Sequence, residues 1–180
     1  MKTGMKIRVL ATIAIAILIA LASCHRSPTS TAPTAANGSG WELDNGQRAQ
    51  ISDYKGKVLL LDFYATWCDP CRAETPHLVY LHQRYAAQGL RIVGLNVGGA
   101  DDHAEVPAFA TEFGIQYLLA VPDDDFVDQY LGLNRNIPQS FIFDRQGKVV
   151  KRFVGFGQGS AQELDRTVES TLAQSSNSTK

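Results

Sequence analysis

Apolar residues are concentrated in short segments whose spacing alternates between strand-like and helix-like. Residues 58–66 are almost continuously apolar with one acid among them, which predicts a strand buried on both faces. Residues 91–97 predict a second central strand. Between these strands, residues 71–88 have apolar side chains at helical spacing and end before Gly89, a residue type that often follows a helix.

The rest of the chain continues this alternation in shorter segments. It predicts a helix within 104–113, a strand at 117–121, a short helix near 126–131, a hairpin of 141–143 with 149–154, and a last helix. That last helix is expected to open at Ser160, because Ser160 and Glu163 have the spacing of a capping box. Crossover connections make neighbouring strands parallel, and the hairpin adds an antiparallel pair. We therefore expect one α/β domain with a mixed sheet.

The first residues of the chain have a different pattern. Three basic residues precede the mostly apolar run of residues 9–22, which ends at Ser23 and Cys24. This arrangement is typical of an export signal, and the run is shorter than the stretch of about 20 residues that spans a bilayer. The alternative is an uncleaved anchor helix in which Cys24 is incidental. Both interpretations place the rest of the chain outside the cytoplasm.

The segment after the signal is rich in Ser, Thr, Pro, Ala and Gly and has no large apolar side chain before Trp41. Such a segment buries too little surface to offset the entropy of ordering, so it predicts a flexible tether. We divide the chain into a signal peptide at 1–23, the tether at 24–40, a folded domain at 41–174 and a disordered tail at 175–180.

Composition narrows the classes of function. The chain has 17 Lys and Arg against 18 Asp and Glu, and removal of residues 1–23 leaves 14 basic residues and a net charge of −4. A nucleic-acid-binding protein normally has a basic surplus, so no nucleic-acid partner is expected. Three cysteines are too few for a disulfide-stapled scaffold. Because their number is odd, one cysteine of an exported protein needs a separate role.

The candidate chemistry lies in Trp67-Cys68-Asp69-Pro70-Cys71, between the first central strand and the helix. A helix N-terminus offers unpaired N–H groups and a partial positive charge, which favour a thiolate. We expect Cys68 to attack a partner disulfide and Cys71 to resolve the mixed disulfide. Pro70 suits the first helical turn, where its missing N–H is not needed.

A passive disulfide and half of a zinc site are the alternative interpretations of this motif. Zinc would need further ligands, and the 4 histidines of the chain form no second paired motif. Covalent haem would need a histidine after the second cysteine, where Arg72 stands. We therefore expect a redox pair that uses neither a metal nor a cofactor.

With these residues the chain resembles the thioredoxin superfamily, and most closely its extracytoplasmic TlpA/ResA-like branch. The resemblance covers about residues 41–172. It is carried by 56–58, 63–71, Glu74 with Pro76, 137–138, 141–144 and 147–148. It implies a thioredoxin-like fold of the α/β class, with a central mixed β-sheet flanked by helices and a strand-helix insertion over about 91–119.

The resemblance also implies roles for individual residues. Pro138 resembles the cis-proline that faces the cysteine pair, although most X-Pro bonds are trans. The backbone of Ile137 would then pair with an extended substrate segment. Trp67, Asp69 and Pro70 complete the expected substrate-binding surface.

Two acids are candidates for proton transfer. Asp62 lies inside the apolar strand, where burial raises the pKa of a carboxyl group and favours its protonated form. A raised pKa would suit Asp62 to accept the proton of Cys71 during exchange. Glu74 matches the acidic residue of the TlpA/ResA-like branch. The alternative is that Glu74 is a solvated residue in the first turn of the helix, favoured there by the helix dipole. Asp69 adds a negative charge beside Cys68, which disfavours the thiolate and predicts a reducing couple.

The sequence Leu21-Ala22-Ser23-Cys24 is similar to a bacterial lipobox, which implies that Cys24 is acylated and begins the mature chain. We therefore expect a membrane-tethered, extracytoplasmic thiol-disulfide oxidoreductase that reduces disulfides of exported proteins, on the periplasmic face in a Gram-negative cell. The resemblance implies a membrane thiol transporter as electron donor and cytochrome c maturation as one task. The alternatives are a thiol peroxidase or antioxidant protein, and a non-catalytic metal- or haem-handling lipoprotein.

Overall fold

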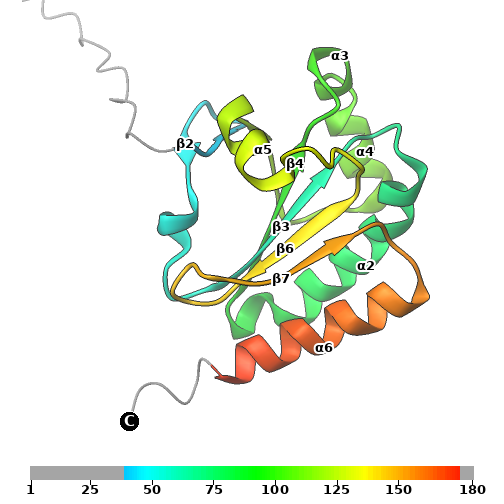
Figure 1. Cartoon of the computed structure of the whole chain (residues 1–180). Coiled ribbons are helices and arrows are strands. Elements are labelled where there is room, and N and C mark those ends of the chain that lie inside the picture. The colour runs from blue at the N-terminus through cyan, green and yellow to red at the C-terminus, as the bar shows by residue number, and fades with distance from the viewer. Residues whose placement is uncertain (1–38, 175–180) are drawn as a thin grey trace, which may run out of the picture. The chain divides into compact units, whose positions relative to one another are not determined.

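The computed structural model describes residues 39–174 (Figure 1). The predicted signal peptide, Cys24, all but the last two residues of the predicted tether, and the predicted tail lie outside this range. In the described part of the chain, the strands form a single sheet in the order β2-β1-β5-β4-β3-β6-β7. No helix within residues 39–174 is long and apolar enough to cross a membrane.

The sheet is mixed, as the sequence predicts. Its strands are β1 (Trp41–Leu43), β2 (Arg48–Ala49), β3 (Val58–Tyr64), β4 (Leu90–Asn96), β5 (Leu118–Pro122), β6 (Gln139–Phe143) and β7 (Val149–Val154). The central strand β3 is parallel to β4, and β4 is parallel to β5. The hairpin strands β6 and β7 are antiparallel, and β6 also runs antiparallel to β3.

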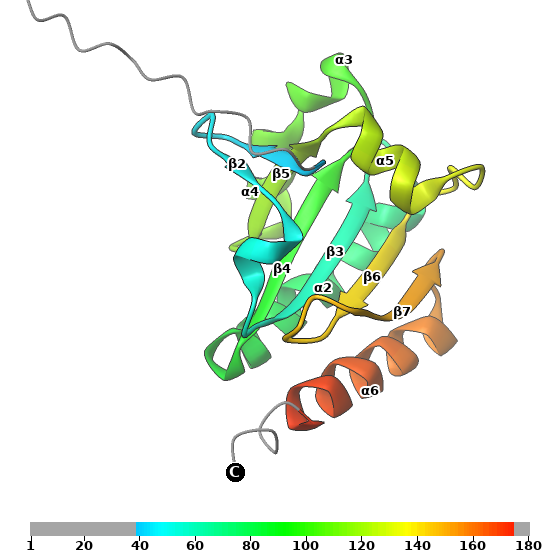
Figure 2. The ribbon, with the colours of Figure 1, turned by 60° about the vertical axis from the view of Figure 1, so that its left-hand side comes forward.

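Helices lie on both faces of this sheet (Figures 1 and 2). They are α2 (Asp69–Tyr85), α3 (Ala100–His103), α4 (Val106–Phe113), α5 (Asp124–Leu131) and α6 (Gln158–Gln174), with the 3-10 segments η1 (Ile51–Tyr54) and η2 (Ala86–Gln88). The segment α2-η2 ends at Gly89, which has a φ of 103°, a left-handed conformation that glycine adopts without steric cost. The predicted end of this helical segment is therefore confirmed.

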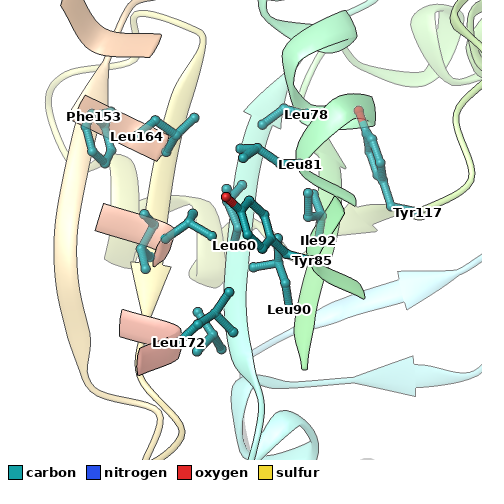
Figure 3. Close-up of a cluster of buried hydrophobic side chains, with 13 residues drawn as sticks. Leu60, Leu78, Leu81, Tyr85, Leu90, Ile92, Tyr117, Phe153, Leu164 and Leu172 are labelled. Carbon is teal, nitrogen blue, oxygen red and sulfur yellow. The ribbon is translucent and has the colours of Figure 1, made fainter. Parts of the chain in front are cut away.

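Strand alternation divides the core of the domain into two layers. Val58 and Leu60 of β3 point toward α2 and α6, where they join Leu78, Leu81 and other apolar side chains (Figure 3). The alternate residues of β3 face the opposite layer, which contains α5 and Trp41 of β1. Because both faces are covered, β3 is buried along its whole length, which explains its continuous apolar sequence.

Several details differ from the sequence prediction. Helix α6 begins at Gln158, so the predicted start at Ser160 is wrong, and Ser160 Oγ instead accepts a bond from Gly157 N at 2.7 Å. The antiparallel pair β1-β2 was not predicted, because strands of 3 and 2 residues have no measurable periodicity. Gly40, assigned to the tether, is buried and donates its N–H to Asp123 Oδ2 at 2.9 Å.

Candidate active site

Cys68 and Cys71 form a disulfide at the start of α2. Cys68 is the N-cap residue, and its sulfur accepts a hydrogen bond from the backbone N–H of Cys71 at 3.3 Å. Pro70 lies in the first helical turn, as predicted. Both cysteines are nearly buried, with Cys68 5% and Cys71 1% exposed, so Cys68 is the more exposed residue by a small margin.

The turn before the helix presents an aromatic side chain beside the disulfide. β3 ends at Tyr64, and Cys68 N donates to Ala65 O at 3.2 Å, which closes the turn. Trp67 at its tip is 66% exposed. Since large aromatic side chains are usually buried, an exposed tryptophan beside a reactive bond is suited to contact a partner molecule.

The loop before β6 lies against the same disulfide. The Ile137–Pro138 peptide bond is cis, so the predicted cis bond is confirmed. The carbonyl oxygen of Ile137 lies 3.7 Å from Cys68 Sγ. The side chain of Gln139 donates to the Asn136 carbonyl at 2.6 Å and helps to fix the loop. A backbone segment is thus held next to the sulfur that a partner would reach first.

The two predicted acids are brought together beneath the motif. Asp62 follows Val58 and Leu60 on the α2-facing side of β3, and Glu74 lies one turn after Cys71 on α2. Each is 3% exposed. Ser140 of β6 is opposite Asp62 in the sheet, and its hydroxyl donates to Glu74 Oε1 at 2.7 Å. Glu74 is therefore a buried residue, which excludes the alternative of a solvated first-turn acid.

Burial changes the protonation of both carboxyl groups. The pKa of Glu74 is raised to about 7 by burial, against the opposing effect of the Ser140 hydrogen bond. Burial, and next the charge of Glu74, raise the pKa of Asp62 well above its usual range. Within the described residues, Asp62 Oδ1 and Glu74 Oε2 have no hydrogen-bond partner. The pair can therefore exchange protons near neutral pH, a property that suits a proton acceptor.

A groove of about 360 Å³ opens beside the disulfide. Trp67 and Ile137 form the end nearest the cysteines, and Val127 and Leu131 of α5 form an apolar wall. Arg135 adds a charged side chain to the lining. Such a mixture of apolar and polar groups is typical of a ligand-binding site.

A model of the AhpC/TSA family matches residues 28–152, more than half of the chain. The chain belongs to the AhpC/TSA family. Proteins named thiol-disulfide oxidoreductase ResA are similar to it: that of Geobacillus thermodenitrificans is 34% identical over 110 residues, and that of Bacillus subtilis 33% over 114 residues. These alignments cover 61% and 63% of this chain, and in both cases 62% of the relative's own length.

A solved structure supports the thioredoxin-like fold. A thioredoxin family protein of Chlorobium tepidum, titled thiol:disulfide interchange protein, has a TM-score of 0.64 and 29% identity. The match covers 75% of this chain and 92% of that protein. The thioredoxin-like fold and the resemblance to the TlpA/ResA-like branch are therefore confirmed.

Sequence patterns did not identify some of the residues around the site of this AhpC/TSA domain. Ser140 could have been found as the polar residue next to the apolar run 141–143, on a strand that pairs with the one containing Asp62. Thr66 and Asp102 are both buried and bonded to each other across 36 residues of sequence. No spacing rule predicts that contact, because it depends on where the segment after β4 folds back.

Asp69 lies at the start of α2 with an exposed side chain, next to Cys68 as the sequence requires. Among residues 39–174, no three His, Cys, Asp or Glu side chains lie together as a metal-binding group. The chemistry that the described residues support is therefore centred on the two sulfurs and the carboxyl pair.

Proposed function

We propose that this domain is a thiol-disulfide oxidoreductase that reduces disulfides in other proteins. The observation that carries the proposal is the Cys68–Cys71 disulfide at a helix N-terminus, with an exposed Trp67 and the Ile137 carbonyl beside Cys68. The similarity to proteins named thiol-disulfide oxidoreductase ResA supports it, although this chain spans 62% of their length.

The reaction begins from the dithiol form. The Cys68 thiolate attacks one sulfur of the target disulfide, a mixed disulfide forms, and the other target sulfur leaves as a thiolate. Cys71 then loses its proton and attacks Cys68 Sγ, so that the second target sulfur also leaves. Two electrons have passed to the target, which takes up two protons, and Cys68 and Cys71 are oxidised to the disulfide. An external dithiol must reduce this disulfide before the next cycle.

Asp62 and Glu74 are proposed to accept the proton of Cys71. Glu74 follows Cys71 by three positions on α2, and both residues are buried on the side of the helix that faces the sheet. A buried carboxylate with a pKa of about 7 is half ionised at neutral pH, so it can take a proton and release it again. Since the two acids interact, we assign this role to the pair.

The direction of transfer is proposed to be reductive. Asp69 adds a negative charge next to the sulfur that lies at the positive end of the helix dipole, and this charge disfavours the Cys68 thiolate. A less stable thiolate means a less stable reduced form and a more reducing couple.

The proposed setting of this reaction is the outside of the cytoplasmic membrane. The lipobox-like sequence supports acylation of Cys24, which would tether the domain through residues 25–38. A membrane thiol transporter would supply electrons, and exported proteins with disulfides would be the targets. Cytochrome c maturation is one task that fits these partners.

A trapping experiment tests the exchange mechanism. Replacement of Cys71 by Ala leaves Cys68 able to form a mixed disulfide but removes the group that resolves it. We expect Cys71→Ala, expressed in the native host, to accumulate adducts through Cys68 that mass spectrometry identifies. The double variant with Cys68→Ser serves as the control and should trap nothing. Equal adduct patterns in both variants would contradict the proposal.

A further inference from the structure

The turn that contains Trp67 and Cys68 is held by a buried carboxylate, Asp102, which belongs to the segment after β4. Asp102 of α3 is 5% exposed. Its two carboxylate oxygens accept the backbone N–H of Thr66 at 3.2 and 3.1 Å, and Oδ1 also accepts the Thr66 hydroxyl. Asn96, at the end of β4, donates its side-chain N–H to Asp102 Oδ2 at 2.6 Å.

These hydrogen bonds keep Asp102 ionised despite its burial. Burial alone would raise the pKa of Asp102, but the bonds from Thr66 and Asn96 outweigh it and lower the pKa. A buried charge is stable only when its hydrogen-bonding capacity is satisfied, and loss of one partner is costly. Asp102 and Thr66 are therefore strongly coupled.

The Asp102 carboxylate occupies the space that a side chain at position 98 would fill, and residue 98 is a glycine. A Cβ atom at Gly98 would lie 2.2 Å from Asp102 Oδ2 and 2.6 Å from Asp102 Cβ. Any larger residue would displace Asp102 from its position against Thr66. This steric requirement gives a reason for glycine at position 98.

Arg72 of α2 holds Thr66 from its carbonyl side. Its Nη1 donates to the carbonyl oxygen of Thr66 at 3.1 Å. Arg72 is itself fixed by an ion pair with Glu112 and by the Phe113 ring, whose centroid lies 5.1 Å from the guanidinium carbon. Thr66 is thus bonded at its N–H, its hydroxyl and its carbonyl, two positions before the reactive Cys68.

We propose that Asp102 is a positioning residue for the Cys68–Cys71 couple, acting through Thr66. The inference rests on the proposed exchange function. It extends that function to a residue whose described side-chain hydrogen bonds are to Thr66 and Asn96 and not to either sulfur. Asp102 fixes the turn of residues 65–68 and so fixes Cys68 relative to Cys71, which is anchored in the helix.

Two physical effects of Asp102 on the couple have the same sign. A fixed turn keeps Cys68 close to Cys71, which raises their effective concentration and favours the disulfide. The negative charge of Asp102, near the helix N-terminus, disfavours the Cys68 thiolate and so disfavours the dithiol form. Neutralising Asp102 therefore moves the equilibrium toward the dithiol.

The test equilibrates purified protein with glutathione buffers and measures the dithiol fraction by alkylation. We expect Asp102→Asn to shift the equilibrium constant toward the dithiol by about tenfold, which corresponds to about 30 mV. Asp101→Asn is the matched control, because Asp101 is the preceding residue of α3 and is exposed. It should shift the constant by less than about twofold.

A second variant separates positioning from loss of folding. Gly98→Ala keeps the carboxylate but moves it, and it should shift the equilibrium in the same direction by about threefold or more. An unchanged equilibrium in Asp102→Asn with a lower free energy of unfolding would reduce Asp102 to a structural residue and overturn the inference. If Asp102→Asn does not fold, an unchanged equilibrium in Gly98→Ala overturns it.

Insulin reduction, measured beside the glutathione equilibrium, distinguishes this inference from the proposed function. Exchange with glutathione depends on the cysteine pair and its turn, whereas insulin reduction depends also on substrate recognition. Wild-type protein that equilibrates with glutathione but leaves insulin intact contradicts the proposed function, and a tenfold shift in Asp102→Asn would then still support the inference.

Discussion

Glu74 shows at the residue scale how burial turns a common side chain into a proton carrier. It lies one turn beyond Cys71, is 3% exposed, and has only the Ser140 hydroxyl as a hydrogen-bond donor among the described contacts. The charge of Glu74 in turn raises the pKa of Asp62, because two buried carboxyl groups cannot both ionise easily. The sequence suggested both acids, but it could not decide whether Glu74 was buried, since first-turn acids are often solvated.

This burial predicts a pH-dependent stability. The pKa of Glu74 is about 7 in the folded protein against 4.5 ordinarily, so the folded state holds a proton that the unfolded state releases. Stability contributed by this group therefore falls as pH rises from about 4.5 through 7. We expect Glu74→Gln to be more stable than wild type by up to about 3 kcal/mol near pH 8, and to show little difference near pH 4.

Urea unfolding of the oxidised protein at the two pH values measures this difference. Glu105→Gln is the control, because Glu105 is exposed and its substitution should change stability by less than about 0.5 kcal/mol at either pH. The same stability difference between Glu74→Gln and wild type at pH 4 and pH 8 would show that Glu74 does not titrate as described.

Asp69 has a separate effect at the residue scale, on the redox equilibrium. Removal of its charge beside Cys68 stabilises the thiolate, so Asp69→Asn should shift the equilibrium with glutathione toward the dithiol by about three- to tenfold. Raising the salt concentration should reduce the difference, because Asp69 is exposed and its charge is screened. A shift toward the disulfide would contradict the role given to Asp69.

At the element scale, the strand β3 and the helix α2 place the two reactive segments, and both could be predicted from hydrophobic spacing. β3 is buried on both faces and reads as a continuous apolar run, and α2 buries one stripe against it. The start of α6 could not be predicted from its capping box, because the Ser160 hydroxyl bonds to the preceding Gly157 instead. The short strands β1 and β2 have too few residues for a pattern.

The packing of α2 against β3 predicts that a cavity between them strongly lowers the free energy of unfolding. Leu81 of α2 is fully buried in the cluster that includes β3 and α6 (Figure 3). Leu81→Ala should lower the free energy of unfolding by about 2–5 kcal/mol in chemical denaturation. Leu133→Ala is the control, since Leu133 is fully exposed and its truncation should change stability by less than about 0.5 kcal/mol. Equal effects of both changes would contradict the described core.

At the scale of the whole molecule, the site is assembled from segments far apart in sequence. Asp62, Cys68 and Glu74 come from consecutive elements, and their proximity follows from the strand-turn-helix order. Ile137 and Ser140 join them only because β6 pairs with β3 in an antiparallel register. The sequence predicted Ile137 and Pro138 through family resemblance. Ser140 is marked in the sequence only as a polar residue beside the apolar run 141–143. Asp102 depends on the tertiary arrangement and could not be predicted from local patterns.

The proposed membrane tether is also a property of the whole chain. If Cys24 is acylated, Cys24→Ala should remove the protein from the membrane fraction or leave the unprocessed precursor there, as cell fractionation and mass spectrometry would show. Cys68→Ser, which keeps Cys24, should remain in the membrane fraction with normal processing. Unchanged processing and fractionation of Cys24→Ala would count against the lipobox.

The most direct test of the central claim is the rate at which purified protein, supplied with a dithiol reductant, reduces the disulfides of insulin. We predict that wild type accelerates this reaction well above the rate with reductant alone, and that Cys68→Ser abolishes the acceleration because no mixed disulfide can form. A wild-type rate equal to the rate with reductant alone, or full acceleration by Cys68→Ser, would contradict disulfide reduction through the Cys68–Cys71 pair.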